Sequence, residues 1–175
     1  CKGYETILDI GTGSGCIPIS IKKQLNNTLI YGLDISENAL VVARDNAGLN
    51  STEVTFIKGD ILQMSSIKYS LKKEFDIIIS NPPYITNSEK TLMSDNVLIF
   101  EPDVALFVED DDPLLFYDKI GHLAHENLSP GGKLYFEINE HFGDQTKSLL
   151  KSIGFSDIRI LKDLQNKNRI VAAIR

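Results

Sequence analysis

The sequence lacks long apolar runs, an excess of basic residues and all but two cysteines. No apolar run approaches the roughly 18 residues of a transmembrane helix, and the composition indicates neither a disordered nor a membrane-spanning chain. The net charge of −6 disfavours a protein that grips nucleic acid by its phosphates, so we expect no stable nucleic-acid binding. Cys1 and Cys16 have no metal-binding spacing, and two cysteines in a domain this large favour reduced thiols in a cytoplasmic protein.

An initiator methionine and a signal peptide are also missing, because the chain opens Cys1-Lys2-Gly3-Tyr4. A predicted strand begins almost at once, so we expect a domain cut from a longer protein. The 175 residues suit one domain with a sizeable core, and we find neither an internal repeat nor a second domain. We therefore expect residues 1–175 to form a single domain.

Strand and helix patterns alternate along the chain, which predicts a doubly wound α/β sheet. Residues 75–80 are almost continuously apolar, as is typical of a parallel strand buried on both faces. No helix separates the last two strands, so we expect them to pair antiparallel. The predicted strands are residues 6–10, 28–34, 54–58, 75–80, 133–138, 156–161 and 169–174, and the predicted helices are residues 16–24, 36–48, 112–128 and 144–153.

Three local signals set boundaries within this pattern. Ser36 is the predicted N-cap of the second helix. Asp112 followed by Pro113 predicts a capped helix start with proline in the first turn. Pro130-Gly131-Gly132 predicts a turn that leads into the strand at residues 133–138.

A glycine-rich loop follows the first predicted strand, at the place where a doubly wound sheet binds its cofactor. Glycines let a ligand approach the backbone, and the next helix offers N–H groups and the positive end of its dipole. A dinucleotide fingerprint requires its third glycine where this chain has Cys16, which disfavours an NAD-dependent oxidoreductase. A tight turn without a ligand is the structural alternative. The loop reads Asp9-Ile10-Gly11-Thr12-Gly13-Ser14-Gly15.

Two carboxylates end the next two strands. Asp34 lies 19 residues after Gly15, where a carboxylate accepts both hydroxyls of a ribose. Asp60 follows Gly59 at the end of the third strand, where it suits an adenine amino group, with the N–H of Ile61 facing a ring nitrogen. A helix cap at Asp34 and an ordinary turn at Gly59-Asp60 are the structural alternatives. Together with the loop, these residues predict a nucleoside cofactor along one edge of the sheet.

Asn81-Pro82-Pro83-Tyr84, which we call the lip, follows the strand at residues 75–80. Proline has no N–H, so Pro82 and Pro83 offer carbonyl acceptors only. The residue before a proline is held extended, which aims the polar groups of Asn81 and Pro82 outward. Asn81 adds a side-chain carbonyl and Tyr84 a flat ring, so the lip suits a planar substrate with an NH2 group. A strand that ends at a proline turn is the alternative.

The segment from Ile85 to Asp112 is long for a connection and is predicted to be a substrate lid. Its acidic run at residues 109–112 is better explained by the N-terminus of a helix than by a basic partner. His122 and His125 are near enough on a helix to share a metal, but no carboxylate or cysteine pattern completes a site. We therefore predict no metal site.

Taken together, these residues resemble the S-adenosylmethionine-dependent methyltransferases. The likeness is strongest to the HemK/PrmC family, the protein-glutamine N5-methyltransferases that modify peptide chain release factors. It covers nearly the whole chain, and it implies a Rossmann-like, mostly parallel seven-stranded sheet with the last strand antiparallel. The resemblance rests on residues 9–15, Asp34, residues 43–46, Gly59-Asp60, residues 80–84, 101–106 and 128–132, Glu137-Ile138 and Lys162-Asp163.

The resemblance implies S-adenosylmethionine as cofactor, S-adenosylhomocysteine as product and a release factor as protein substrate. It assigns the methionine end of the cofactor to the loop, the ribose to Asp34, and the adenine to Asp60 with Ile61. Members of the family carry an N-terminal helical domain that helps bind the release factor, and this sequence does not contain it. The implied cofactor residues of the loop are Asp9, Gly11, Thr12, Gly13, Ser14 and Gly15.

The resemblance makes Asn81, Pro82, Pro83 and Tyr84 catalytic and places Asn81 at the reactive end of the cofactor. Asn81 Oδ1 and the Pro82 carbonyl would accept the two N–H bonds of a glutamine amide, with Tyr84 stacked on its plane. An amide nitrogen is a poor nucleophile because its lone pair is delocalised. Accepting both of its protons raises the electron density on nitrogen and aims the lone pair at the sulfonium methyl, so catalysis is mostly positioning.

Two other functions remain open at this point. The lip alone also suits an N-methyltransferase that acts on an exocyclic amino group of a flipped-out nucleobase, in ribosomal RNA guanine or DNA adenine. Residues 101–106 favour a glutamine amide instead, by the same resemblance. A non-catalytic interaction module is the other alternative, and it is disfavoured because the loop and the lip are both intact.

Overall fold

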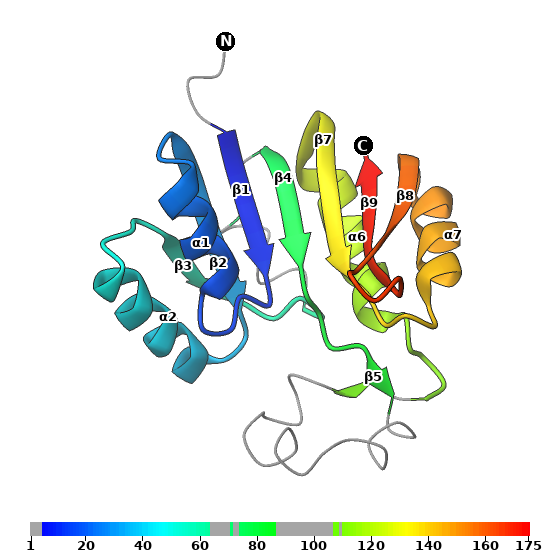
Figure 1. Ribbon diagram of the computed structural model, residues 1–175, viewed down its shortest axis with the longest axis horizontal. Helices are drawn as coiled ribbons and strands as arrows, with labels where there is room; N and C mark the ends of the chain where they lie inside the picture. The colour runs from blue at the N-terminus through cyan, green and yellow to red at the C-terminus, as the bar shows by residue number, and fades with distance from the viewer. Residues whose placement is uncertain (1–4, 64–70, 72–73, 87–106, 109) are drawn as a thin grey trace.

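The computed structural model describes residues 5–63, 71, 74–86, 107–108 and 110–175 (Figure 1). Seven strands form one sheet in the order β3-β2-β1-β4-β7-β9-β8. The strands of this sheet are β1 (Glu5–Ile10), β2 (Thr28–Asp34), β3 (Thr55–Lys58), β4 (Phe75–Ser80), β7 (Leu128–Glu137), β8 (Ser156–Lys162) and β9 (Asn168–Ile174). The helices are α1 (Cys16–Gln24), α2 (Glu37–Leu49), α6 (Leu115–Asn127) and α7 (Gly143–Ile153).

The sheet is parallel except at β9, which pairs antiparallel with both β7 and β8. β1 lies next to β4, the central strand of the sheet, and Ile7, Leu8 and Ile10 of β1 are buried. β4 beside it buries Phe75 and Ile78 completely, as its apolar run predicts. The predicted doubly wound α/β sheet with an antiparallel last strand is confirmed.

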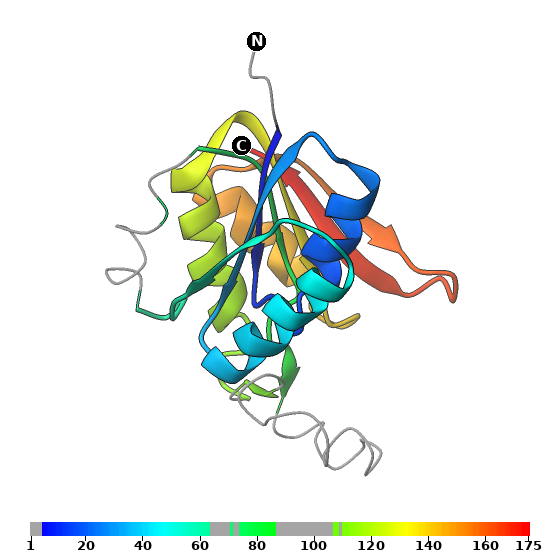
Figure 2. The same ribbon diagram turned by 90° about the vertical axis from the view of Figure 1, so that its left-hand side faces the viewer.

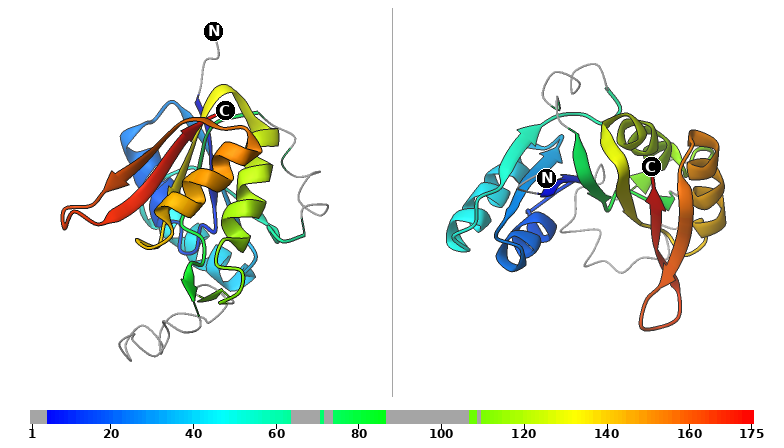
Figure 3. Two further views of the ribbon diagram at one scale, coloured as in Figure 1. Left: turned by 90° about the vertical axis from the view of Figure 1, so that its right-hand side faces the viewer. Right: turned by 90° about the horizontal axis from the view of Figure 1, so that it is seen from above.

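Helices cover both faces of the sheet (Figures 2 and 3). α1 and α2 lie on one face, and α6 and α7 lie side by side on the other. The contact between α6 and α7 is close, because a Cβ added to Gly121 of α6 would lie 2.8 Å from the Ile153 side chain of α7. No helix in the described part of the chain has both the length and the apolar content needed to cross a membrane.

Of the two predicted helix starts with a capping residue, one is confirmed and the other is wrong. Ser36 caps α2 as predicted, because its hydroxyl accepts a hydrogen bond from the Ala39 N–H at 3.2 Å. The predicted cap at Asp112 is wrong, since α6 begins at Leu115 and its N-cap position, Leu114, makes no side-chain cap. Asp112 instead accepts from the Leu115 N–H with its main-chain carbonyl, at 3.3 Å, in the turn before the helix.

The turn predicted at Pro130-Gly131-Gly132 is wrong. These residues lie within the continuous strand β7. Leu128 pairs with Phe75 and Lys133 with Ile77, so β7 accommodates its extra residues as an irregularity in the ladder. Leu128 is fully buried, and this contact with β4 extends the strand to the N-terminal side of the glycines. Pairing with a neighbouring strand therefore overrides the local turn signal.

A second, two-stranded sheet was not predicted. β5 (Ile85–Thr86) pairs in parallel with β6 (Phe107–Val108). These strands flank residues 87–106, so the two ends of most of the predicted lid are held together directly after the lip. Residues 101–106, which narrowed the family resemblance, lie outside the described residues, and the lid remains a prediction.

Candidate active site

The predicted site residues meet at the edge of the sheet where the parallel strands end. Across this edge, the residues that end β3, β2, β1 and β4 follow one another in space. Three strand spacings separate the first from the last, which is roughly 14 Å. From β3 to β4, the residues in this row are Asp60, Asp34, Gly11 and Asn81.

The glycine-rich loop is tied to the end of β2 by its main chain. The N–H groups of Gly11 and Thr12 both donate to the Leu33 carbonyl, at 2.8 and 3.0 Å. Gly13 has a φ of +55°, and a Cβ added to it would meet no atom within 4 Å. Open space therefore lies over the loop at Gly13, where a bound cofactor would approach the backbone.

Asp34 fixes the loop from the end of β2. Its Oδ2 accepts from the Gly13 N–H at 2.8 Å, and its Oδ1 accepts from the Ser36 N–H at 2.9 Å. Since each carboxylate oxygen can accept more than one hydrogen bond, capacity remains for a ligand. The ribose contact of Asp34 stays a prediction, and its structural role in holding the loop was not predicted.

Asp60 closes the turn that follows β3. Its two oxygens accept from the Leu62 N–H at 2.9 Å and from the Gln63 side chain at 3.0 Å. Ile61 is half-buried and packs against the hydrophobic core. The structure thus places Asp60 and Ile61 at the predicted edge in an ordered turn, and their contact with adenine remains a prediction.

Asp9 is the buried carboxyl group beneath the loop. It is 1% exposed, and its Oδ2 accepts from the Thr12 hydroxyl at 2.7 Å. Its Oδ1 is buried and has no hydrogen-bond partner among the described residues. Burial raises the pKa of Asp9 to about 7, the Thr12 hydrogen bond opposes this rise, and the nearby charge of Asp34 adds to it. A proton or a ligand donor would complete such a group, which fits a cofactor with an N–H group.

The lip lies directly beside the loop. The Ser80 hydroxyl donates to the Ile10 carbonyl at 2.7 Å, which ties the end of β4 to the end of β1. A Cβ added to Gly11 would lie 3.8 Å from the Asn81 carbonyl oxygen. Asn81 is exposed and Pro82 is buried, while Pro83 is half-buried. The structure therefore brings the predicted acceptor-binding residue Asn81 against the predicted cofactor loop.

Tyr84 at the far end of the lip is half-buried and packs against the core. Its hydroxyl donates to Glu137 Oε1 at 3.1 Å, and its carbonyl accepts from the Asn139 side chain at 3.3 Å. Burial raises the pKa of Tyr84, the charge and hydrogen bond of Glu137 raise it further, and Arg169 opposes this. These partners were not predicted as site residues. Glu137 belonged to the Glu137-Ile138 stretch that carried the family resemblance, but its contact with Tyr84 follows only from the adjacency of β4 and β7.

Asn46 is a further residue that was not predicted as part of the site. Its side chain donates to the Ser14 carbonyl at 3.0 Å and so anchors the loop to α2. Asn46 belonged to the stretch at residues 43–46 that carried the family resemblance, which was the only signal for it.

No metal-binding cluster of three His, Cys, Asp or Glu side chains occurs among the described residues. His122 lies 3.5 Å from Asp118 one turn earlier on α6. His125 instead contacts the Phe155 ring edge-on, with 5.5 Å between ring centroids. His122 therefore pairs within α6, and His125 packs α6 against Phe155.

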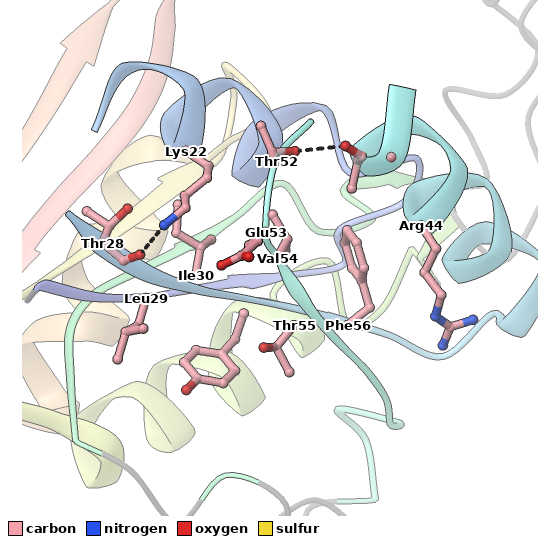
Figure 4. Close-up of a pocket in the computed structure, with 13 residues that line it drawn as sticks. Lys22, Thr28, Leu29, Ile30, Arg44, Thr52, Glu53, Val54, Thr55 and Phe56 are labelled. Carbon is pink, nitrogen blue, oxygen red and sulfur yellow. Dashed lines mark hydrogen bonds between the residues drawn. The ribbon is translucent and has the colours of Figure 1, made fainter. Parts of the chain in front are cut away.

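A cavity of about 370 Å³ lies between α1, α2, β2 and β3 (Figure 4), and none of the predicted site residues lines it. Lys22 in its wall donates to the Thr28 carbonyl at 2.7 Å, and the Thr52 hydroxyl donates to the Ala47 carbonyl at 3.3 Å. These polar groups satisfy the protein's own backbone. We assign the cavity no role in the site.

The fold and the family match place the chain among the Rossmann-like methyltransferases. A methyltransferase from Pyrococcus furiosus has the same fold, with a TM-score of 0.73 at 22% identity over 98% of this chain and 75% of that chain. The methyltransferase domain family matches residues 2–168, and the chain belongs to this family.

Two curated relatives confirm the resemblance drawn from the sequence. The release factor glutamine methyltransferase of Flavobacterium psychrophilum is 50% identical over 165 residues, which cover 94% of this chain and 56% of that protein. The protein of the same name from Bacteroides thetaiotaomicron is 47% identical over 169 residues, covering 97% of this chain and 60% of that protein. The chain thus spans somewhat over half the length of these relatives.

Proposed function

We propose that this chain transfers a methyl group from S-adenosylmethionine to the side-chain amide nitrogen of a glutamine in a peptide chain release factor. The observation that carries the proposal is the close approach of the lip to the loop, with the Asn81 carbonyl 3.8 Å from a Cβ position on Gly11. The relatives named release factor glutamine methyltransferase support this choice of acceptor over a nucleobase.

The residues at the ends of β1, β2 and β3 would hold the cofactor. The buried Asp9 Oδ1 has no hydrogen-bond partner among the described residues, and it would accept from the amino group of the methionine end. Asp34 would accept from the ribose hydroxyls, and Asp60 with the N–H of Ile61 would bind the adenine. S-adenosylmethionine supplies, when bound, an electrophilic methyl group on a sulfonium centre.

The lip would hold the acceptor. Asn81 Oδ1 and the Pro82 carbonyl accept the two N–H bonds of the glutamine amide, and the ring of Tyr84 lies against the amide plane. Pro83 adds no N–H donor that would compete for these acceptors. Catalysis then comes mainly from aligning the amide lone pair with the methyl group, a contribution that reaches several kcal/mol.

The proposal extends to the setting of the reaction. A release factor is the protein partner, residues 1–175 act as the catalytic domain, and the reaction takes place in the cytoplasm. The net charge of −6 supports a protein acceptor rather than stable binding to nucleic acid.

A labelling experiment tests this function. The purified protein is incubated with methyl-labelled S-adenosylmethionine and, separately, with release factor, a glutamine-containing release factor peptide at high concentration, duplex DNA and ribosomal RNA. We expect label on a glutamine side chain of the release factor and its peptide, located by mass spectrometry. Label on nucleic acid, or none on either glutamine substrate, would overturn the proposal. Glu53→Gln, an exposed carboxylate away from the site, serves as the matched control.

A further inference from the structure

Two side chains at the end of β7 hold Tyr84 at both of its ends. Glu137 Oε1 accepts from the Tyr84 hydroxyl at 3.1 Å, which fixes the outer end of the ring. Asn139 Nδ2 donates to the Tyr84 carbonyl at 3.3 Å, which fixes the main chain of the lip. With both ends held, the ring has little freedom to tilt.

Glu137 is itself held in place. The Tyr117 hydroxyl donates to the Glu137 carbonyl at 3.3 Å. Tyr117 is fully buried, and its ring meets that of Phe136 edge-on, with 5.2 Å between centroids. The Ile138 N–H donates to the Arg169 carbonyl at 2.9 Å, so the end of β7 is also tied to β9. A buried and well-connected strand end therefore carries the Glu137 carboxylate.

Asn139 has its amide orientation set by a neighbour. Its Oδ1 accepts from the His141 N–H at 3.0 Å, which leaves Nδ2 directed at the Tyr84 carbonyl. Asn139 is only 8% exposed, and both bonds are partly buried.

The charges around Tyr84 favour a neutral phenol that donates to a carboxylate. The negative charge of Glu137 opposes ionisation of Tyr84, and the positive charge of Arg169 acts in the other direction. Arg169 is paired with Asp163 at 3.2 Å, so its charge is partly balanced by another carboxylate. The hydroxyl proton therefore stays on Tyr84 at neutral pH and is available for the bond to Glu137.

We propose that Glu137 and Asn139 are positioning residues that fix the plane of the Tyr84 ring against which the acceptor amide lies. This rests on the proposed function in one respect, namely that Tyr84 contacts the acceptor. The nitrogen lone pair of a planar amide lies along the normal to the amide plane. A tilted Tyr84 ring would tilt this plane and turn the lone pair away from the methyl group. A loss of alignment lowers turnover without weakening cofactor binding.

The first test measures the Tyr84 phenol directly and needs no methyl transfer. The protein is labelled with 13C at the tyrosine ζ carbon and titrated by NMR, with Tyr84→Phe used to assign the signal. We expect Glu137→Gln to lower the pKa of Tyr84, because the charge is removed while a hydrogen-bond acceptor remains. The pKa of Tyr117, which the Glu137 charge also raises, should fall as well, and tyrosines away from Glu137 should be unchanged. An unchanged Tyr84 titration would overturn the proposal, whichever substrate the protein methylates.

The second test is a double-mutant cycle on methyl transfer to the release factor. Glu137→Ala and Tyr84→Phe should each lower kcat/KM for the acceptor about tenfold, as expected for loss of a hydrogen bond to a charged group. The double variant should be no worse than Tyr84→Phe alone, and Glu137→Gln should recover part of the loss. S-adenosylhomocysteine affinity should stay within about twofold.

A purely structural role for Glu137 predicts a different pattern. Glu137→Ala would then lower activity by the same factor in the Tyr84→Phe background as in the wild type, which would overturn the proposal. Glu53→Gln, far from the lip, should match the wild type in every assay and controls for the loss of a carboxylate charge.

Discussion

The two halves of the candidate site, the cofactor side and the lip side, are held by different kinds of hydrogen bond. On the side of β1, β2 and β3, main-chain N–H groups of the loop donate to the Leu33 carbonyl and to the Asp34 carboxylate. On the side of β4, β7 and β9, side chains are the donors to Tyr84 or its acceptors, as in the bonds from the Tyr84 hydroxyl to Glu137 and from the Asn139 side chain to the Tyr84 carbonyl. The halves meet where the Asn81 carbonyl lies against Gly11.

This difference divides the expected effects of substitution. The first half requires a backbone that passes close to a ligand, so changes there should act on cofactor affinity and on folding. The second half requires the orientation of particular groups, so changes there should act on turnover. A substitution in the first half that lowered only turnover, or one in the second half that lowered only cofactor affinity, would contradict this division.

The largest effect is expected at Asp9, the buried carboxyl group of the first half. Its pKa rises from 3.8 to about 7 on folding, mainly because of burial. The folded protein thus binds more protons than the unfolded chain between about pH 4 and pH 7, and it loses up to about 4 kcal/mol of stability as the pH rises through this window. Asp9→Asn removes this loss.

Urea unfolding of the wild type and Asp9→Asn from pH 4 to pH 8 checks this prediction. The unfolding free energy of the variant should rise relative to the wild type up to about pH 7 and then level off. A difference that does not change with pH would show that Asp9 is not a buried acid of raised pKa.

The next effect concerns the second half. Asn81→Ala should lower turnover about a hundredfold or more, because the amide loses an acceptor and its alignment. Cofactor affinity should change little, which is measured by equilibrium binding of S-adenosylhomocysteine. If the variant methylates at nearly the wild-type rate, Asn81 does not align the acceptor amide as proposed.

Asp34→Ala, in the first half, should have the reverse effect, namely weaker cofactor binding with little change in turnover. It removes the carboxylate that accepts from Gly13 and Ser36, and we expect S-adenosylhomocysteine affinity to fall about tenfold or more. Turnover at saturating cofactor should stay near that of the wild type. Glu5→Gln, at the opposite edge of the sheet, is the control, and an unchanged affinity in Asp34→Ala would count against a cofactor site at this edge.

The smallest effect separates two glycines of the same loop. Both have positive φ, but a Cβ on Gly15 would lie 3.1 Å from the Ile19 side chain and 3.2 Å from that of Ala43, whereas one on Gly13 meets nothing within 4 Å. Gly15→Ala should therefore lower the unfolding free energy by about 1 kcal/mol more than Gly13→Ala. Denaturant unfolding measures this, and equal losses would mean that packing at Gly15 does not matter.

The first half was predictable from the sequence because its signals are local. The loop follows the first strand, Asp34 is the last residue of the second, and Asp60 comes two residues after the third ends. Parallel pairing then brings them to one edge. The predicted bounds of α1, β2 and β4 agree with the structure for the same reason.

The rest depends on contacts between distant parts of the chain. Tyr84 lies 53 residues from Glu137 and 55 from Asn139 in sequence, so only the adjacency of β4 and β7 brings them together. The same adjacency extends β7 across Pro130-Gly131-Gly132, where local rules indicated a turn.

The most direct test of the central claim is an experimental structure of the protein with S-adenosylhomocysteine bound. The account predicts that the ligand lies along the carboxyl edge of the sheet, with its adenine beside Asp60, its ribose at Asp34 and its sulfur directed at Asn81. Binding elsewhere, such as in the cavity beside Lys22, or with the sulfur turned away from the lip, would contradict it.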